Sequence, residues 1–305
     1  DDRTPREIGK GSVKLRDYFK TVGLFLGRFR IVPGPPIHRS PTAVVAKADD
    51  VTTGASVAIK FFSDASQWRR ETAARADNAL DELYVVSSAR AEEIDPNDTT
   101  LRTLKISLKG VHLGAFIIVM PAADRNLLDI FQKERPDIDR IREMVREVIE
   151  FLAHVHDNGL SHGDIKMNNV VRVNEKLRLI DLDAVAKLGG EQSFIGAKFS
   201  SAVLPPEMLY RLRDDDELRA FEDYWREEKA GDTELWRKIA PKRDEKGDRF
   251  VVKTFRVVDD GDAPDCSRSL PYDLVAASRA VDIWAIGALL CFLLGKEPIV
   301  LSNLD

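Results

Sequence analysis

The segment 161–169, which reads Ser-His-Gly-Asp-Ile-Lys-Met-Asn-Asn, constrains this chain more than any other part of the sequence. Within it, Asp164 is followed by Lys166 two residues later and by Asn169 five residues later. A carboxylate can orient and deprotonate a hydroxyl, an ammonium can lie beside a migrating phosphate, and an amide oxygen can ligate a metal ion. These are the side chains that phosphoryl transfer requires.

This segment resembles the catalytic loop of protein kinases, whose usual sequence is His-Arg-Asp-Leu-Lys-x-x-Asn. Four more segments resemble kinase motifs in the family's order: 57–60 (Val-Ala-Ile-Lys), 179–183 in place of Asp-Phe-Gly, 204–207 in place of Ala-Pro-Glu, and 282–287 in place of Asp-x-Trp-x-x-Gly. Five ordered motifs span most of the chain, so the sequence is similar to the eukaryotic-type, Ser/Thr-like protein kinases.

The resemblance implies an α+β, bilobal protein-kinase-like fold with a small β-rich N-lobe and a larger helical C-lobe. We expect an N-terminal extension, an N-lobe, a hinge and a C-lobe over residues 1–30, 31–120, 121–126 and 127–305. The stretch between Glu207 and Asp282 is several times longer than in the family, which predicts a long insert over 211–278, after the activation segment.

We expect the insert to lie beside the substrate surface or to replace the packing of the last helices of the family fold, rather than to be a mobile surface loop. The sequence stops at Asp305, before the place where those helices would follow. A truncated C-terminus and a start at Asp1 indicate a monomeric domain of a larger protein.

Hydrophobic patterns predict the elements of the N-terminal part. Strand-like runs at 43–48 and 56–62 flank a turn at Thr53-Gly54, and a continuous apolar run at 115–120 is typical of a buried strand. Residues 66–83 are compatible with a helix, 84–86 suggest a further strand, and 92–100 are expected to form a surface loop.

Spacings of three and four residues predict a helix over 138–158, with an apolar stripe made of Ile141, Met144, Val145, Val148, Ile149, Leu152 and Val155. The insert begins with a charged, helix-like run over 213–229 that carries Phe221, Tyr224 and Trp225 on one side. A β-like run follows at 250–255.

For ATP, the resemblance assigns a phosphate clamp to Lys60, held by a glutamate of the next helix. Glu71 and Glu82 are the two candidates, and the distance from Glu71 to the next strand-like run favours Glu71. The resemblance places the adenine against Val45, Ala58, Met120, the carbonyl of Pro121 and the N–H of Ala123.

For catalysis, the resemblance makes Asp164 the catalytic carboxylate, with Lys166 and Lys60 beside the phosphates. Asn169 and Asp181 are the expected Mg²⁺ ligands, because carboxylate and amide oxygens suit this hard cation. His162 and Asp282 are expected to be structural, with Asp282 accepting hydrogen bonds from the catalytic-loop backbone.

The sequence departs from the family at three places. The glycines of the glycine-rich loop are replaced by His38, Ser40 and Ala43, which predicts weaker nucleotide binding. Asp183 replaces the glycine after the metal-binding aspartate, where it either stiffens the segment or adds a carboxylate. Gly163 replaces the arginine that pairs with an activation-segment phosphate, so activity is expected not to require that phosphorylation.

These residues favour an ATP- and Mg²⁺-dependent protein serine/threonine kinase, because Lys166 and Ser200 occupy positions typical of Ser/Thr kinases. A pseudokinase that acts as a binding or scaffold module is the alternative, motivated by the missing glycines and Asp183. A small-molecule kinase is disfavoured, because its members generally lack the motifs at 205–207 and 282–287.

The resemblance implies a protein substrate as the partner, and composition bears on the other classes of partner. A net charge of -5 gives no basic footprint, so nucleic acid is not an expected partner. Only two cysteines, Cys266 and Cys291, are present, which favours a reducing, cytoplasmic compartment. The longest apolar run, near 283–294, is too short to span a bilayer.

Overall fold

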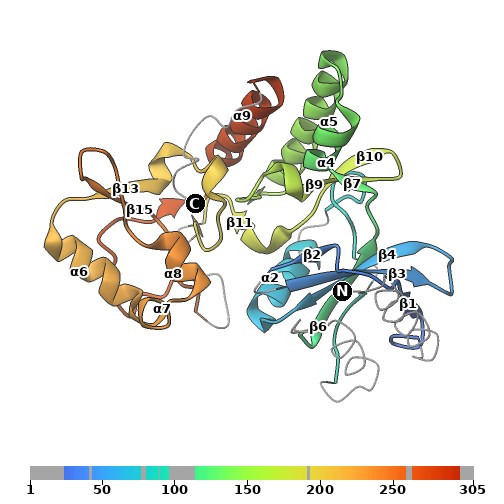
Figure 1. Ribbon diagram of the computed structural model, residues 1–305, viewed down its shortest axis with the longest axis horizontal. Coiled ribbons are helices and arrows are strands. Elements are labelled where there is room, and N and C mark those ends of the chain that lie inside the picture. Colours follow the sequence, from blue (N-terminus) through green and yellow to red (C-terminus); the bar gives the residue numbers. More distant parts are fainter. Residues whose placement is uncertain are drawn as a thin grey trace, which may run out of the picture. The chain divides into compact units, whose positions relative to one another are not determined.

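The computed structural model describes residues 24–40, 43–76, 80–88, 90–95, 114–190, 193–258 and 263–295 (Figure 1). The chain divides into two compact units, one of Asp1–Thr72 and Val86–Asp124 and the other of Ala73–Val85 and Arg125–Asp305. The first is rich in strands and the second in helices, which confirms the expected α+β, kinase-like fold. Most of the expected N-terminal extension lies outside the described residues.

The first unit is built on a six-stranded antiparallel sheet in the order β1-β3-β4-β6-β5, with β2 paired to β3. Its strands are β1 (Phe29–Ile31), β2 (His38–Arg39), β3 (Ala43–Asp50), β4 (Ser56–Phe62), β5 (Arg90–Glu93) and β6 (Phe116–Pro121). Alternate apolar side chains bury one face of the sheet. This core contains Phe25, Phe29, Val44, Ala46, Val57, Ile59, Phe61, Ile117 and Val119.

The turn between β3 and β4 lies where the sequence predicts it, and Asp50 organises it. The Asp50 carboxylate accepts hydrogen bonds from the Thr52 N–H (3.0 Å) and the Thr53 hydroxyl (2.7 Å). Gly54 completes the turn at φ +75°, a conformation that glycine adopts without strain. The strands predicted at 43–48, 56–62 and 115–120 are therefore confirmed as β3, β4 and β6.

The strand predicted at 84–86 is wrong. Val85 makes only an isolated bridge, with Leu179 of the second unit, and the strand that extends the sheet is β5. Strand β5 has the sequence Arg-Ala-Glu-Glu, which does not resemble a strand. An edge strand tolerates such charges. The surface loop expected over 92–100 thus begins later, and residues 96–100 lie outside the described part of the chain.

One helix of the N-terminal part, α2 (Ala65–Ala76), ends earlier than the helix-compatible run over 66–83. The Asp64 carboxylate accepts a hydrogen bond from the Ser66 N–H (2.7 Å) at its start. The Trp68 indole then donates to the Ile117 carbonyl oxygen of β6 (3.0 Å), which fixes the rotation of the helix against the sheet.

The second unit has a helical core around α4 (Leu127–Glu134), α5 (Ile138–Asp157) and α9 (Arg279–Gly295). Asn126 caps α4 and Asp137 caps α5, each accepting a hydrogen bond from a first-turn N–H. The predicted stripe on α5 is buried except for Ile149, which is half exposed. At 3.6 residues per turn, Phe151 and His156 bound the buried arc and Ile149 falls just outside it.

Short strands and 3-10 helices hold the loops of this unit. The sheet β10-β9-β7 consists of Lys176–Leu179, Val170–Val173 and Arg125–Asn126, and β8 (Leu160–Ser161) pairs with β11 (Ala186–Lys187). The 3-10 helices are η1 (Met167–Asn169), η2 (Leu182–Ala184), η3 (Ser201–Val203) and η4 (Pro206–Met208). None of the described helices is long and apolar enough to cross a membrane.

The predicted insert is folded into helices and a small sheet (Figure 1). It contains α6 (Asp215–Tyr224), α7 (Arg226–Ala230) and α8 (Glu234–Ile239), and the sheet β13-β15-β14, made of Leu209–Leu212, Arg249–Val252 and Lys242–Arg243. The helix-like run over 213–229 is two helices, because the chain leaves α6 at Trp225, whose side chain is buried. The β-like run over 250–255 contributes to β15.

The core of the insert continues into the activation segment. Phe221, Tyr224, Trp225, Val251 and Tyr272 of the insert share one cluster with Ile195, Phe199, Leu204 and Met208 of the activation segment and with Val281 of α9. In addition, β12 (Phe194–Ile195) pairs with β16 (Val275–Ala276). The insert therefore packs on the activation segment.

Candidate active site

One buried carboxylate, Asp282 of α9, shapes the loop that carries Asp164. It accepts hydrogen bonds from the backbone N–H groups of His162 (2.8 Å) and Gly163 (2.9 Å) and from the Ser161 hydroxyl (2.9 Å). The Nε2 atom of His156 lies 2.9 Å from the same carboxylate. Burial opposes ionisation, but the His156 hydrogen bond and the donors of the loop lower the pKa of Asp282, which favours its charged form.

The backbone conformation at Gly163 explains the departure from arginine at this position. Gly163 has φ +76°, and a Cβ atom there would lie 2.6 Å from the Ala184 carbonyl oxygen. A side chain at this position would therefore require the loop or η2 to shift.

Asp164 lies at the centre of a compact polar cluster in the second unit. Its Oδ2 atom accepts hydrogen bonds from Lys166 Nζ (2.6 Å) and from Asn169 Nδ2 (3.1 Å). Lys166 also donates to the Ser200 hydroxyl (2.9 Å), and Asn169 donates to the Asp164 carbonyl oxygen (2.9 Å). The sequence-predicted residues Asp164, Lys166 and Asn169 thus come together in space.

The second carboxylate oxygen of Asp164 has a different environment. The Asp164 side chain is fully buried, yet its Oδ1 atom has no hydrogen-bond partner among the described residues. A buried, unpaired carboxylate oxygen is costly, so this atom indicates a place for an external donor.

Asp181 and Asp183 lie on either side of one ammonium group. Lys198 Nζ is 2.6 Å from Asp181 Oδ2 and 2.6 Å from Asp183 Oδ1. Burial would lower the pKa of Lys198, but the carboxylates of Asp181, Asp183 and Asp164 raise it well above its ordinary value. Lys198 is therefore charged, and its side chain is a cation fixed in the site.

The oxygen donors of this unit suit magnesium. Asp181 already holds a cation, and Asn169 uses its amide nitrogen for Asp164, which leaves its amide oxygen as the atom that would ligate a metal. Carboxylate and amide oxygens are the donors that Mg²⁺ takes in proteins, so both predicted ligands fit. Asp183 adds a third oxygen donor beside them.

In the first unit, Lys60 forms the predicted ion pair on β4. Its Nζ atom lies 2.7 Å from Glu71 Oε2, and the Glu71 side chain is buried. Glu71 is thus the partner, and Glu82 is not. Trp68, one turn before Glu71 on α2, ties the helix to β6 and thereby sets the position of the pair.

Four of the residues predicted to contact adenine, Val45, Ala58, Met120 and Pro121, lie on three neighbouring strands of the first unit, and Ala123 follows the last of these strands. Ala58 of β4 pairs with Met120 of β6, and Val45 of β3 pairs with Lys60. The Ala122 N–H donates to the Ser56 carbonyl oxygen of β4. Because the C=O and N–H of one trans peptide point in opposite directions, the Pro121 carbonyl faces away from β4.

Ser40 forms hydrogen bonds across the turn where the glycine-rich loop is expected. The Ser40 hydroxyl accepts a hydrogen bond from the Ala43 N–H (3.0 Å), and the Ser40 N–H donates to the Ala43 carbonyl oxygen (2.8 Å). The hairpin β2-β3 is thus closed by side-chain and backbone bonds. The residues at its tip, 41–42, lie outside the described part of the chain.

The insert holds the activation segment by polar contacts as well as apolar ones. The Thr254 hydroxyl, which is buried, donates to the Gly196 carbonyl oxygen (2.6 Å). Lys238 donates to the Phe199 carbonyl oxygen, and its ammonium lies 4.1 Å from the centre of the Phe199 ring. The Lys253 N–H donates to the Met208 carbonyl oxygen (2.7 Å). These contacts hold the activation segment against the insert.

Sequence reasoning missed Lys198 and the insert residues that reach the activation segment. A lysine between Asp181 and Glu207 has no distinguishing pattern. The available signal was Asp183, because an extra carboxylate beside a metal-binding aspartate requires a counter-ion when it is buried. The contacts of Thr254 and Lys238 depend on how the insert folds.

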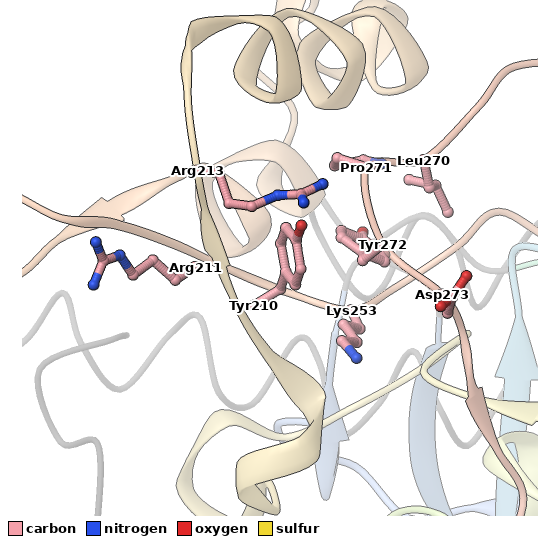
Figure 2. A pocket seen from close by; sticks show the side chains of 8 residues that line it. All are labelled: Tyr210, Arg211, Arg213, Lys253, Leu270, Pro271, Tyr272 and Asp273. Atoms are coloured by element: carbon pink, nitrogen blue, oxygen red, sulfur yellow. The ribbon is translucent and has the colours of Figure 1, made fainter.

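A groove of about 800 Å³ lies on the surface of the insert (Figure 2). Figure 2 shows that the Arg213 side chain lies over Tyr210 and that the Arg211 side chain points away from Tyr210. Both arginines already have acidic partners, since Arg213 Nε lies 2.5 Å from Glu217 and Arg211 lies 3.0 Å from Asp248. Lys253 and Asp273 also line the groove, so it carries charged side chains of both signs.

Comparison with known proteins agrees with this architecture. Residues 40–226 match the protein kinase domain. Cyclin-dependent kinase 12 of Caenorhabditis elegans is 29% identical over 177 residues, 54% of this chain and 23% of that protein. A probable serine/threonine-protein kinase of Dictyostelium discoideum is 28% identical over 171 residues, 55% of this chain and 31% of that protein. Serine/threonine-protein kinase PAK 1 of Mus musculus is 27% identical over 165 residues, 54% of this chain and 28% of that protein.

The match covers more than half of the chain, so the chain belongs to the protein kinase family. It spans less than a third of the length of these three relatives.

Proposed function

We propose that this chain is an ATP- and magnesium-dependent protein kinase that transfers the γ-phosphoryl group to serine or threonine hydroxyls of a protein substrate. The observation that carries the proposal is the buried Asp164 carboxylate. Its Oδ2 atom is held by Lys166 and Asn169, whereas Oδ1 has no partner among the described residues. This is the arrangement that a base for a substrate hydroxyl requires.

The chain's own residues divide the work of the reaction. Asp164 Oδ1 accepts the hydrogen bond of the substrate hydroxyl and then its proton, and the two contacts to Oδ2 keep the carboxylate from rotating away. Lys166 keeps its ammonium beside Asp164, where it can stabilise negative charge on the migrating group. Lys60, held by Glu71, supplies the ammonium proposed for the other phosphates. Magnesium, when bound through Asp181 and Asn169, neutralises charge on the phosphate oxygens.

The Ser/Thr class rests on the contact between Lys166 and Ser200. The Ser200 hydroxyl accepts a hydrogen bond from Lys166 (2.9 Å), so the activation segment is joined to the catalytic loop at this point. Two of the relatives named above are called serine/threonine kinases, which supports the same class of acceptor.

The test is transfer of labelled phosphate from γ-labelled ATP to serine- and threonine-containing peptides. Asp164→Asn keeps the shape of the side chain but cannot accept the proton, and we expect it to reduce transfer about 100-fold or more. Asp157→Asn, an exposed aspartate at the end of α5, is the matched control and should transfer like the wild type. Asp164→Asn activity within a factor of a few of the wild type would remove Asp164 from its role.

A pseudokinase is the second candidate, and two observations favour it. Lys198 already occupies Asp181, and a serine-closed turn stands where the family has its glycine-rich loop. Calorimetric titration of ATP, with and without magnesium, separates the two candidates. Binding that depends on magnesium supports the kinase, and absence of binding at millimolar nucleotide supports the pseudokinase.

A further inference from the structure

The proposed metal site contains an internal cation that the catalytic scheme does not use. Lys198 lies in the activation segment, far along the chain from Asp181 and Asp183, and its ammonium is 2.6 Å from each carboxylate. The Lys198 side chain is one-third exposed, the Asp181 side chain is 18% exposed and the Asp183 side chain is 4% exposed. The carboxylates are thus more deeply buried than the lysine that balances them.

Burial makes this counter-ion necessary when no metal is bound. Two carboxylates that share one site repel each other, and a carboxylate as buried as Asp183 is unstable without a charged partner. Lys198 supplies a single positive charge at a point equidistant from both groups. A divalent cation ligated by the same oxygens would supply two charges there.

The surroundings of Lys198 allow its side chain to move away from the two carboxylates while its backbone keeps its position. Gly196 is bound by Thr254, Phe199 is bound by Lys238, and Ser200 accepts a hydrogen bond from Lys166. The backbone at Gly196 and Phe199 and the side chain of Ser200 are thus held by contacts that do not involve the Lys198 ammonium. A lysine ammonium is carried on a flexible stem of four carbons. The ammonium can therefore move into solvent without a change in the backbone of the activation segment.

We propose that Lys198 holds the place of a divalent cation between Asp181 and Asp183, and that magnesium must displace it in order to bind. This inference rests on the proposed function, because it takes Asp181 as a metal ligand. It adds that Asp183 is part of the same cation site and that the activation segment sets the metal affinity.

Binding of Mn²⁺ and Mg²⁺ without nucleotide, measured by calorimetry on the full chain, tests the competition. We expect Lys198→Gln to bind either metal about tenfold or more tightly than the wild type, because the ammonium that lies between the two carboxylates is removed. Lys198→Arg keeps the charge and should stay as weak as the wild type. Lys133→Gln, which removes an exposed lysine paired with Asp129 on α4, is the matched control and should not change the affinity.

A second measurement needs no variant. In the wild-type protein, acetylation by a limiting amount of acetic anhydride, followed by mass spectrometry, reports how accessible each amine is. Added magnesium should raise the labelling rate of Lys198 several-fold, about fivefold or more, as the ammonium leaves its two carboxylates. Lys133 serves as the internal reference, and its labelling rate should not change.

The inference is overturned if Lys198→Gln binds metal no more tightly than the wild type, or if it binds no metal at all. It is also overturned if metal binds the wild type while the labelling of Lys198 stays constant. Neither readout requires phosphoryl transfer. A protein that exchanges Lys198 for metal but transfers no phosphate would contradict the proposed kinase activity and leave this inference standing.

Discussion

At the scale of single residues, Gly163 shows how one atom restricts a catalytic loop. Its φ of +76° and the closeness of the Ala184 carbonyl oxygen exclude a Cβ atom, and its N–H is one of the donors to Asp282. The sequence comparison registers only that an arginine is missing. The structure shows that the loop conformation itself requires glycine.

Gly163→Ala should therefore destabilise the second unit through two separable effects. A non-glycine residue at positive φ costs roughly 1–2 kcal/mol, and the contact with Ala184 adds to this cost. Gly159→Ala is the matched control, because Gly159 has φ +73° but open space around its Cβ position. Urea unfolding should show a larger loss for Gly163→Ala than for Gly159→Ala. Equal losses would mean that the contact with Ala184 relaxes without cost.

Motif spacing located Asp164, Lys166, Asn169 and Asp181 because the chemistry needs these residue types at fixed separations within short segments. The same reasoning could not find Lys198, since its contacts to Asp181 and Asp183 cross 17 and 15 residues of irregular chain. Side-chain contacts over such distances depend on the path of the activation segment, which no local pattern specifies.

At the scale of elements, the strength of the hydrophobic signal decided which predictions succeeded. Helix α5 follows a long apolar stripe, and β4 and β6 are buried, β-branched strands, so each was predicted from its sequence. Strand β5 carries charged residues and owes its conformation to pairing with β6, so its sequence resembles a loop. Tertiary pairing outweighed local propensity there.

Helix α4 is joined to its neighbours by a carboxylate whose titration can be measured. Glu134 receives two hydrogen bonds from Arg172 of β9 (2.7 and 2.9 Å) and a further contact from Arg125 of β7. The Arg172 hydrogen bonds, together with Arg125 and against the effect of burial, lower the pKa of Glu134 to about 2. The folded state therefore holds this proton less tightly than the unfolded chain does.

Glu134 should accordingly stabilise the fold above its ordinary pKa, which is 4.5, and lose this contribution as the pH falls from there toward 2. Glu134→Gln should unfold more easily than the wild type at pH 7, and the difference should shrink on acidification. Urea unfolding from pH 7 down toward pH 2 measures this. Glu143→Gln, an exposed carboxylate on α5, controls for the loss of a charge. A difference that grows at low pH would contradict the assignment.

At the scale of the whole molecule, the insert is joined to the kinase fold as part of its core. Phe221 is fully buried in the cluster that also contains Phe199, Leu204 and Met208 of the activation segment. The sequence predicted that an insert exists and where it begins. Its packing could not be predicted, because the insert follows no motif and its contacts reach back to earlier parts of the chain.

Phe221→Ala should cost about 3–5 kcal/mol of unfolding free energy, because it leaves a cavity in this shared core. Leu235→Ala on α8 removes a large apolar side chain that is 42% exposed, so it serves as the control and should cost little. Replacing 211–269 by a Gly/Ser linker should destabilise the second unit further and lower peptide phosphorylation. If the unfolding free energy and the rate of peptide phosphorylation both stay unchanged after the replacement, the insert contributes to neither stability nor activity.

Activity should also be insensitive to phosphatase treatment. The activation segment is held by Thr254, Lys238 and the β12-β16 pair, and Gly163 offers no side chain to a phosphate. Protein treated with a phosphatase and freed of it should transfer phosphate at the rate of untreated protein. Loss of activity on treatment, with recovery after rephosphorylation, would show that a phosphate group is needed after all.

The attachment of the catalytic loop to α9 also determines when the loop can form during synthesis. The hydrogen bonds from Ser161, His162 and Gly163 to Asp282 cross 121, 120 and 119 residues. At translation rates of about 5–20 residues per second, the loop leaves the ribosome roughly 6–24 s before its anchor does. Contacts of such high sequence separation form late in folding. A nascent chain therefore carries an unassembled catalytic loop until the insert and α9 have been made.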